Sequence, residues 1–376
     1  MFSGNSLSIL LRLRIGFIWP ESPRRALISE NTSTSKRRHV IVLLAGTLLA
    51  LAGIGWFLRT KGPQFHWAEF VSTVRGLDPY WMTAAVLLIG LTYVGRALRW
   101  QVLMRPVCPH AKFRGILVAT TIGFATVVLF GRAGEMVRPY LIASREKVSF
   151  SSQLAAWLLE RIYDLLVVLL ISGFALTQLQ GGDAGFSPAL QWVLRMGGYI
   201  IAGICALCII LLLLVRNFSD SMQKRFLSSV SFLPKHYYEK LEEVVRAFAA
   251  GMESTKSHNF VMLLVLYTAA EWIIITGSQV CMFKAAAATA HLGWTDALTF
   301  VGFVAFGSIV QIPGVGGGMQ VASVLVLTEF FGLPFGTATG LAIAFWITTY
   351  VTALPPGLWL AFREGIKISS LRHIEA

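Results

Sequence analysis

Long apolar runs separated by short polar segments dominate the pattern of residues along the chain. Four of these runs approach the roughly 20 residues that a helix needs to cross a bilayer, namely residues 40–58, 153–176, 196–215 and 260–283. A shorter run over residues 81–95 and another over 341–362 bring the predicted full spans to six. The pattern therefore predicts an all-α polytopic membrane protein.

Two further apolar runs are interrupted by glycine-rich breaks. Residues 116–130 are too few for a full span and are separated from residues 136–143 by Gly-Arg-Ala-Gly-Glu, whereas Pro-Gly-Val-Gly-Gly-Gly interrupts residues 298–331. The predicted break residues, which do not favour a continuous helix, are Gly131, Gly134, Pro313, Gly314, Gly316, Gly317 and Gly318. We expect two re-entrant helical hairpins of opposite orientation. The alternative is two ordinary spans whose glycines allow close helix packing.

Basic residues predict the orientation of the spans, because they collect in cytoplasmic loops. Arg96, Arg99 and Arg105 mark the cytoplasmic end of the second span. The loop over residues 178–191 has no Lys or Arg, so we expect it outside the cytoplasm. That position requires residues 116–143 to enter and leave the membrane on the cytoplasmic side.

The same rule divides the chain into three parts. We expect a cytoplasmic N-terminal tail over residues 1–39, a transmembrane domain over 40–362 and a cytoplasmic C-terminal tail over 363–376. The basic loop over residues 216–258 is cytoplasmic in this scheme. Within it, residues 237–252 have a helical apolar pattern, which predicts either a helix along the membrane surface or a solvated connector.

Composition supports a membrane protein and excludes a soluble cytosolic enzyme. The 376 residues are 55% hydrophobic and 14% charged, with a mean hydropathy of +0.66, which is far too apolar for a soluble globular domain. The net charge of +13 comes from 32 Lys and Arg against 19 Asp and Glu. Because basic residues in a membrane chain usually set its orientation, we expect no nucleic-acid partner.

Three charged residues lie inside one predicted span. Each charge of Glu160, Arg161 and Asp164 costs roughly 2.5 to 3.5 kcal/mol at the centre of a membrane helix. Their spacing lets Arg161 pair with Asp164 within the helix, which leaves Glu160 in need of a partner. We expect Glu160 or Asp164 to meet Arg132 or Arg138 at the first break.

These charges predict a polar seam that binds a lipid headgroup. The candidate binding residues are Arg132, Glu135, Arg138, Glu160, Arg161 and Asp164. In this hypothesis Arg132, Arg138 and backbone N–H groups at the break hold a phosphate, while the carboxylates position the arginines. The alternative is a buried ion network that only fixes how the hairpin packs. Glu271, in another span, is a candidate proton-coupling group or a partner in an interior hydrogen bond.

Patterns typical of enzymes and metal sites are missing from the sequence. The seven histidines are scattered through tails and loops, and no second His/Cys pair completes a tetrahedral zinc set. No phosphate-binding P-loop or nucleophile-elbow motif is present. We therefore expect no metal, no cofactor and no catalytic residue.

Four short motifs follow one another in a recognisable order. They are Arg-Ala-Leu-Arg-Trp at 96–100, Gly-Arg-Ala-Gly-Glu-Met-Val-Arg-Pro-Tyr at 131–140, Glu-Arg-Ile-Tyr-Asp at 160–164 and Ile-Pro-Gly-Val-Gly-Gly-Gly at 312–318. Together they resemble the lysylphosphatidylglycerol synthase transmembrane-domain family, also called flippase-like membrane proteins, over about residues 40–362. The resemblance implies a bacterial-type inner-membrane domain that moves a lipid or lipid-linked group between leaflets.

Two features of the sequence differ from relatives in that family. Two-part relatives carry a soluble aminoacyl-transferase domain after the membrane region, whereas this chain ends at Ala376, so we do not expect aminoacylation. The family often has Glu after the second break, where this sequence has Gln320.

The leading expectation is a lipid translocator without an ATPase of its own. Its partner would be an anionic or phosphate-bearing membrane lipid. One alternative is a membrane-embedded lipid-modifying enzyme that uses the same carboxylates as acid and base. Another is an accessory subunit that docks a separate lipid-modifying synthase.

Overall fold

The computed structural model describes residues 66–181, 188–216, 225, 227–230, 234–252, 257–308, 311–312 and 316–365. The predicted N-terminal tail, the first span over residues 40–58 and the break residues Pro313 and Gly314 lie outside this description. The same holds for residues 366–376 of the predicted C-terminal tail.

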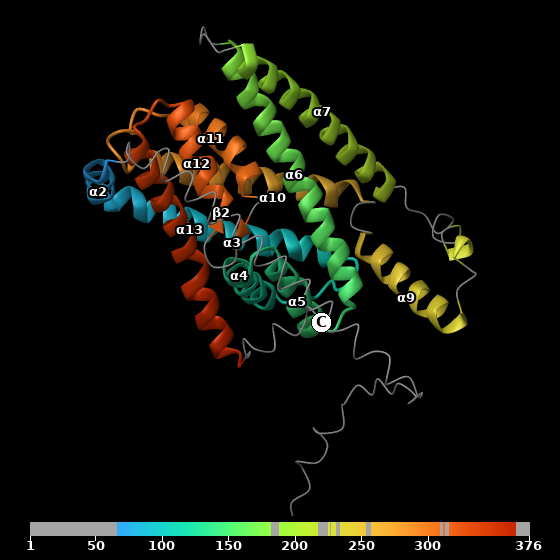
Figure 1. Ribbon diagram of the computed structural model, residues 1–376. Coiled ribbons are helices and arrows are strands. Elements are labelled where there is room, and N and C mark those ends of the chain that lie inside the picture. The colour runs from blue at the N-terminus through green and yellow to red at the C-terminus, as the bar shows by residue number, and fades with distance from the viewer. Residues whose placement is uncertain are drawn as a thin grey trace, which may run out of the picture. The chain divides into compact units, whose positions relative to one another are not determined.

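The described chain is helical, which confirms the predicted all-α class (Figure 1). The elements are α2 (Trp67–Arg75), α3 (Pro79–Met104), α4 (Phe113–Phe130), the 3-10 helix η2 (Gly131–Met136), α5 (Val137–Glu146), α6 (Phe150–Gly181), α7 (Pro188–Arg216), α9 (Lys235–Met252), α10 (His258–Lys284), α11 (Trp294–Gly307), α12 (Gly318–Glu329) and α13 (Phe335–Arg363). Two short strands, β1 (Gln311–Ile312) and β2 (Gly316–Gly317), pair antiparallel at the second break. Five described segments are long and apolar enough to cross a membrane: Pro79–Met104, Phe113–Glu146, Met196–Leu213, His258–Lys284 and Phe335–Arg363.

Helix α3 extends well beyond the apolar run that predicted it. It begins at an N-cap where the Asp78 carboxylate accepts a hydrogen bond from the Tyr80 backbone N–H at 2.8 Å, followed by Pro79 in the first turn. The prediction that this span ends at Gly95 was wrong. The helix continues to Met104 because Trp100 and its apolar neighbours in the last turns are buried.

The first predicted break forms an antiparallel helical hairpin. The Thr126 hydroxyl of α4 donates to the Gly134 carbonyl in η2 at 3.1 Å. Further along, Gly123 lies so close to α5 that a Cβ there would be 2.7 Å from Arg138 Cβ. At the open end, Arg145 Nη1 donates to the Gly115 carbonyl at 3.5 Å. Residues progressively earlier in α4 therefore contact residues progressively later in the segment that ends with α5, so the two helices are antiparallel.

The second break forms a hairpin of opposite orientation. The rings of Phe303 in α11 and Phe330 in α12 are 4.9 Å apart. This hairpin opens at the N-terminal end of α13, since α12 leads directly into that helix. The first hairpin opens at the other end of α13, where Arg145 forms a 2.8 Å ion pair with Glu364. The predicted pair of opposed hairpins is therefore confirmed, while their depth in a membrane stays a prediction.

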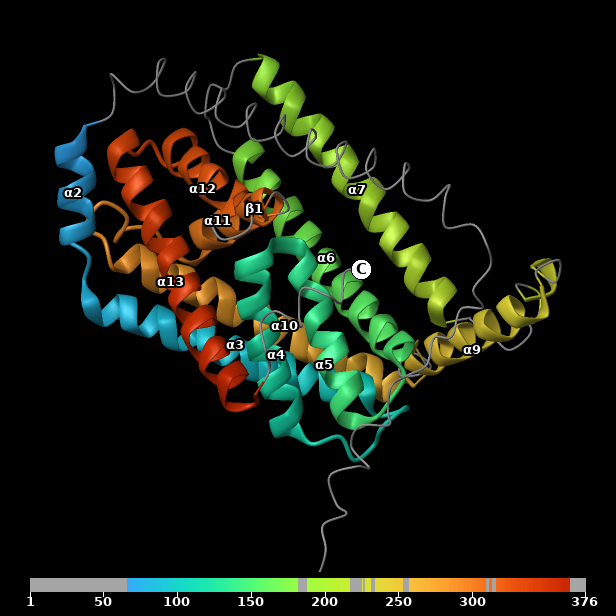
Figure 2. The same ribbon diagram turned by 60° about the horizontal axis from the view of Figure 1, so that its bottom comes forward.

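Contacts between helices repeat in two halves of the chain. One half contains α3, the α4/α5 hairpin and α6, and the other contains α10, the α11/α12 hairpin and α13. Helices α3 and α10 lie side by side in both views (Figure 2). Each half also packs its hairpin against the last helix of the other half: α4 contacts α13, and α11 contacts α6. This exchange is the contact pattern of an inverted repeat.

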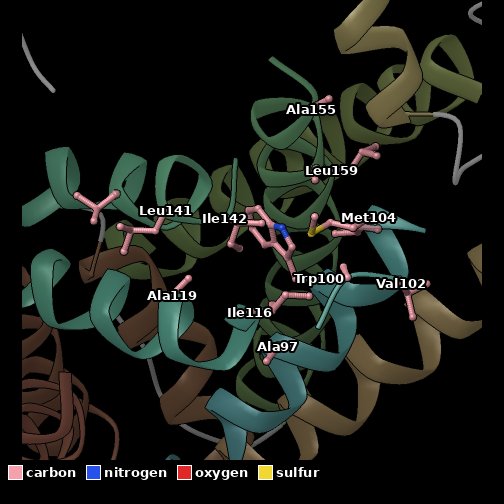
Figure 3. Packing of buried hydrophobic residues seen from close by; sticks show 14 of the residues in the cluster. Ala97, Trp100, Val102, Met104, Ile116, Ala119, Leu141, Ile142, Ala155 and Leu159 are labelled. Carbon is pink, nitrogen blue, oxygen red and sulfur yellow. The ribbon is translucent and has the colours of Figure 1, made fainter. Parts of the chain in front are cut away.

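Two hydrophobic clusters hold these halves together. Figure 3 shows Trp100 among Ile142, Met104 and Leu159, which come from α5, α3 and α6. The Trp100 indole also donates to Gln153 Oε1 at 2.9 Å, so its polar atom is satisfied within the core. The second cluster contains Phe283 and other aromatic rings of α10, α11 and α13.

Helix α9 covers the start of α6. A Cβ on Gly251 would lie 2.9 Å from Ala155 Cβ, so the two backbones approach closely. The interpretation of residues 237–252 as a solvated connector was therefore incomplete, because this helix packs on the transmembrane helices.

Candidate functional site

Six buried or nearly buried charges meet where α3, α5, α6 and α10 converge. We call them the charge cluster; its members are Arg96, Arg99, Arg138, Glu160, Asp164 and Glu271. Three arginines balance three carboxylates, so the cluster has no formal net charge. Neutrality matters here because an uncompensated charge in a low-dielectric interior is costly.

Arg99 occupies the centre of the charge cluster and is only 1% exposed. Its Nη1 donates to Asp164 Oδ1 at 2.6 Å, and its Nη2 donates to Glu160 Oε1 at 2.6 Å. A third hydrogen bond, of 3.1 Å, runs from Nη1 to the Thr268 hydroxyl of α10. One guanidinium therefore ties α3 to both α6 and α10.

Arg138 provides the second connection to Glu160. Its Nη2 forms a short ion pair with Glu160 Oε2, and its guanidinium lies 4.1 Å from the centroid of the Trp100 ring. The prediction that Glu160 or Asp164 meets Arg132 or Arg138 is confirmed by this pair. Through this pair the first hairpin is fixed to α6.

Arg161 and Asp164 do not pair with each other, so that prediction was wrong. Asp164 shares a helix face with Glu160, four residues earlier, and both point to Arg99. Arg161 lies on another face of α6, where its Nε is 3.8 Å from Glu135 Oε2. Asp164 instead accepts two hydrogen bonds from Arg99 of α3, and this bidentate pair is stronger than a pair with Arg161 would be.

Glu271 joins the charge cluster from α10. Arg96 Nη2 is 2.5 Å from Glu271 Oε1, and Arg99 Nη1 is 3.4 Å from Oε2. Both oxygens are buried, and among the described residues neither has a hydrogen bond of good geometry. The carboxylate is thus held by ion pairs; a role in proton coupling stays a prediction.

Sequence reasoning missed Arg96 and Arg99 as site residues. They were expected to flank the membrane on its cytoplasmic side, yet Arg99 is buried and the Arg96 side chain is only 13% exposed. The signal lies in the residues that follow, because Trp100 and residues 102–104 continue an apolar helical pattern.

A small hollow of about 170 Å³, lined by charged and apolar side chains, lies where the two hairpin tips meet. We call it the tip pocket; it is lined by Gly123, Phe124, Val127, Arg132, Glu135, Arg138, Trp157, Arg161 and Ser308. Arg132 bridges the tips, since its Nη1 is 2.7 Å from Glu135 Oε1 and its Nη2 donates to the Ser308 carbonyl at 3.2 Å. The two breaks predicted from sequence therefore face each other.

The tip pocket has an excess of positive charge. Arg138 is neutralised by Glu160, which leaves Arg132 and Arg161 against the single carboxylate of Glu135. Arg132 is half-exposed and Arg161 is one-third exposed. Arg161 makes no hydrogen bond within the part of the chain that is described. This arrangement offers unused guanidinium donors to an anionic group.

The predicted site residues thus divide into two groups. Arg132, Glu135 and Arg161 line the tip pocket, whereas Glu160 and Asp164 lie in the charge cluster; Arg138 belongs to both. Across the described ranges, no three His, Cys, Asp or Glu side chains are grouped so that they could hold a metal ion.

The predicted break glycines have identifiable roles. Gly131 has φ of 65° and ends α4, and Gly317 has φ of 105° directly before α12. Gly134 packs against the backbone of Thr126 with no room for a Cβ. Gly316 and Gly317 form β2, and Gly318 is the first residue of α12.

Comparison with known proteins identifies a family that matches most of the chain. Residues 42–357 match the family described as "Lysylphosphatidylglycerol synthase TM region". A curated protein from Haloferax volcanii, named glycosyltransferase AglD, is 25% identical over 140 residues, which cover 37% of this chain and 22% of that protein. The chain therefore spans under a quarter of the length of that relative. No solved structure matches the chain.

Proposed function

We propose that this chain, which belongs to the lysylphosphatidylglycerol synthase transmembrane-region family, is a lipid translocator that moves a lipid or lipid-linked headgroup between leaflets. The observation that carries the proposal is the tip pocket, a positively charged hollow where two opposed helical hairpins meet. In secondary transporters, substrate sites lie near broken helices of inverted repeats. The long apolar helices and the membership of this family both support a function within a membrane.

The tip pocket fits an anionic headgroup rather than a neutral one. Arg132 and Arg161 together exceed the charge of Glu135 by one, and both guanidinium groups reach the surface of the hollow. A phosphate or phosphodiester would accept charge-assisted hydrogen bonds from such a pair, each worth about 1.5–3 kcal/mol. We therefore assign headgroup binding to Arg132 and Arg161, which Glu135 positions.

The charge cluster has a different role in this proposal. Its carboxylates are already neutralised by arginines, so they brace the first hairpin against α3, α6 and α10 rather than bind the headgroup. For the same reason Glu160 and Asp164 are not free to serve as general acid or base, which supports a protein that is not itself an enzyme. Glu271 differs from them because neither of its oxygens accepts a hydrogen bond of good geometry from the described residues. Glu271 is the group that we propose for coupling to a proton gradient.

A lipid-flipping assay in proteoliposomes tests the proposal. Fluorescently tagged phosphatidylglycerol would be placed in both leaflets, and a membrane-impermeant quencher would report how fast protected lipid reaches the outer leaflet. We expect Arg132→Gln and Arg161→Gln each to slow exchange about tenfold, the factor that corresponds to 1.4 kcal/mol. Arg145→Gln is the matched control, because Arg145 lies on the same hairpin but pairs with Glu364 outside the tip pocket.

Two outcomes would reject the translocator. One is wild-type exchange no faster than in protein-free vesicles. The other is equal exchange by the wild type and both arginine variants. The mass of the recovered lipid is measured in the same samples, since an enzyme would return a product of altered mass.

An accessory subunit of a lipid or glycolipid synthase is the second candidate. It is favoured by the similarity of part of the chain to a protein named as a glycosyltransferase. An accessory subunit would co-purify with a separate synthase and would flip no lipid alone, which distinguishes it from the translocator in the same preparations.

A further inference from the structure

A second and larger hollow of about 710 Å³ lies between α6, α7, α10 and α11, and we call it the apolar groove. Its wall on α10 extends from Val261 to Thr276, which is about 22 Å at 1.5 Å per residue. That length is a large part of the roughly 30 Å hydrocarbon core of a bilayer. The groove therefore runs along the membrane-spanning direction of its helices.

The walls of the apolar groove suit hydrocarbon. No charged side chain lines it. The Thr268 hydroxyl donates to the Leu264 carbonyl at 2.7 Å while it accepts from Arg99, and the Thr276 hydroxyl donates to the Trp272 carbonyl at 2.8 Å. Each threonine has thus used its only donor within the protein, so neither offers a new hydrogen bond to a headgroup.

The apolar groove and the tip pocket lie on different faces of α6. Trp157 and Arg161 line the tip pocket, whereas Tyr163 and Leu166 line the groove. Two residues along a helix correspond to a rotation of about 200°, so Tyr163 lies nearly opposite Arg161. The charge cluster occupies the space between them, and Thr268 connects that cluster to the groove wall.

We propose that the apolar groove is a separate lipid site, which binds the hydrocarbon chain of a membrane lipid other than the one whose headgroup occupies the tip pocket. Its volume is within the range of about 300–1,000 Å³ that is usual for pockets holding ligands of drug size, enough for an extended chain. Because its walls are uncharged and its flanking helices are apolar, the groove favours a hydrocarbon chain over a charged lipid headgroup. The site does not depend on the proposed transport.

Two adjacent alanines of α10 provide a matched pair of variants. Ala269 and Ala270 are both exposed, but only Ala269 lines the groove. Ala269→Trp would fill the groove, and Ala270→Trp would add the same side chain beside it. Because both positions are exposed, neither change disrupts the packed core, which thermal unfolding of the purified variants verifies.

The probe is phosphatidylcholine with a photoactivatable diazirine in one acyl chain. Protein reconstituted with it is transferred into probe-free detergent and irradiated, and cross-linked residues are located by mass spectrometry. We expect cross-links at groove residues such as Leu166 and Ile273, reduced about tenfold in Ala269→Trp, the factor that corresponds to 1.4 kcal/mol. Cross-linking in Ala270→Trp and in Arg132→Gln should equal that of the wild type.

Two results would overturn the second site. Equal retention of probe at the groove and at Ile200 on the exposed surface of α7 would indicate ordinary surrounding lipid. Absence of groove cross-links would indicate that protein covers the groove. A loss of flipping in Arg132→Gln with intact groove cross-linking would separate this proposal from the translocation site.

Discussion

Among the charge-cluster side chains, Arg99 makes the most hydrogen bonds within the described residues. It neutralises two carboxylates of α6, donates a hydrogen bond to the Thr268 hydroxyl of α10 and forms an ion pair with Glu271 of the same helix. Glu160 pairs with both Arg99 and Arg138, whereas Asp164 pairs with Arg99. Removing Arg99 would therefore leave two carboxylates with only one arginine, Arg138, which does not contact Asp164. The cluster behaves as one unit rather than as separate pairs.

Replacing Arg99 should therefore destabilise the whole membrane domain. We expect Arg99→Gln to lower the free energy of unfolding by about 3–5 kcal/mol, because Asp164 would remain buried without a cation. Thermal unfolding in detergent, followed by tryptophan fluorescence, measures the effect. Arg161→Gln is the control and should cost less than about 1 kcal/mol, since Arg161 is one-third exposed and weakly paired. Equal stability of the two variants would contradict a bracing role.

Physical rules applied to the sequence find part of this site. The high cost of charge in a membrane marks Glu160 and Asp164, and the requirement for a partner leads to Arg138. The same rules misplace Arg99, because an arginine after an apolar run has the pattern of a cytoplasmic flank. The apolar helical pattern of Trp100 and residues 102–104 is the sequence signal against a cytoplasmic flank, and the packing of α3 against α6 and α10 buries Arg99.

Each hairpin depends on glycines where two backbones meet. A Cβ on Gly134 would clash with the Thr126 carbonyl, and one on Gly307 would clash with Ala322 and approach the Gly318 carbonyl to 2.6 Å. The breaks were predictable because proline and clustered glycines disfavour helix continuation. The packing of α9 on α6 was not, because it depends on contacts with a distant segment.

A single methyl group at the first tip should open the hairpin. We expect Gly134→Ala to lower the free energy of unfolding by about 1–3 kcal/mol, because the opposing atoms are backbone and cannot rotate away. Gly173→Ala is the matched control, since Gly173 lies within α6 with nothing near its missing Cβ. That change should raise stability by about 0.5–1 kcal/mol through helix propensity alone. Thermal unfolding of the two variants should thus shift in opposite directions, and shifts of the same sign would refute close tip packing.

At the scale of the described molecule, several exposed aromatic residues lie near the two ends of the helices. Trp67, Tyr80 and Trp294 are exposed near one end, where the start of α3 meets the end of α10 through the 2.8 Å hydrogen bond from Asp78 N–H to the Ala285 carbonyl. Trp359 and Phe362 are exposed at the other end. Aromatic side chains at two levels are typical of the two membrane interfaces. We therefore predict that the opposed hairpins open toward different sides of the membrane.

Cysteine labelling from each side of the membrane tests this arrangement. After Cys108, Cys205, Cys208 and Cys281 are replaced by serine, one cysteine is introduced at a time in place of Lys147, Glu364, His291 or Pro334, all of which are exposed. Lys147 follows the first hairpin and Glu364 follows α13, at the end rich in basic residues, so both should react with a membrane-impermeant thiol reagent only from the cytoplasmic side. His291 and Pro334 flank the second hairpin and should react only from the opposite side.

Because the Arg145–Glu364 ion pair fixes Lys147 and Glu364 at the same end, labelling of these two from different sides would contradict the fold itself. Reversal of all four would leave the fold intact and would show that the basic end faces away from the cytoplasm.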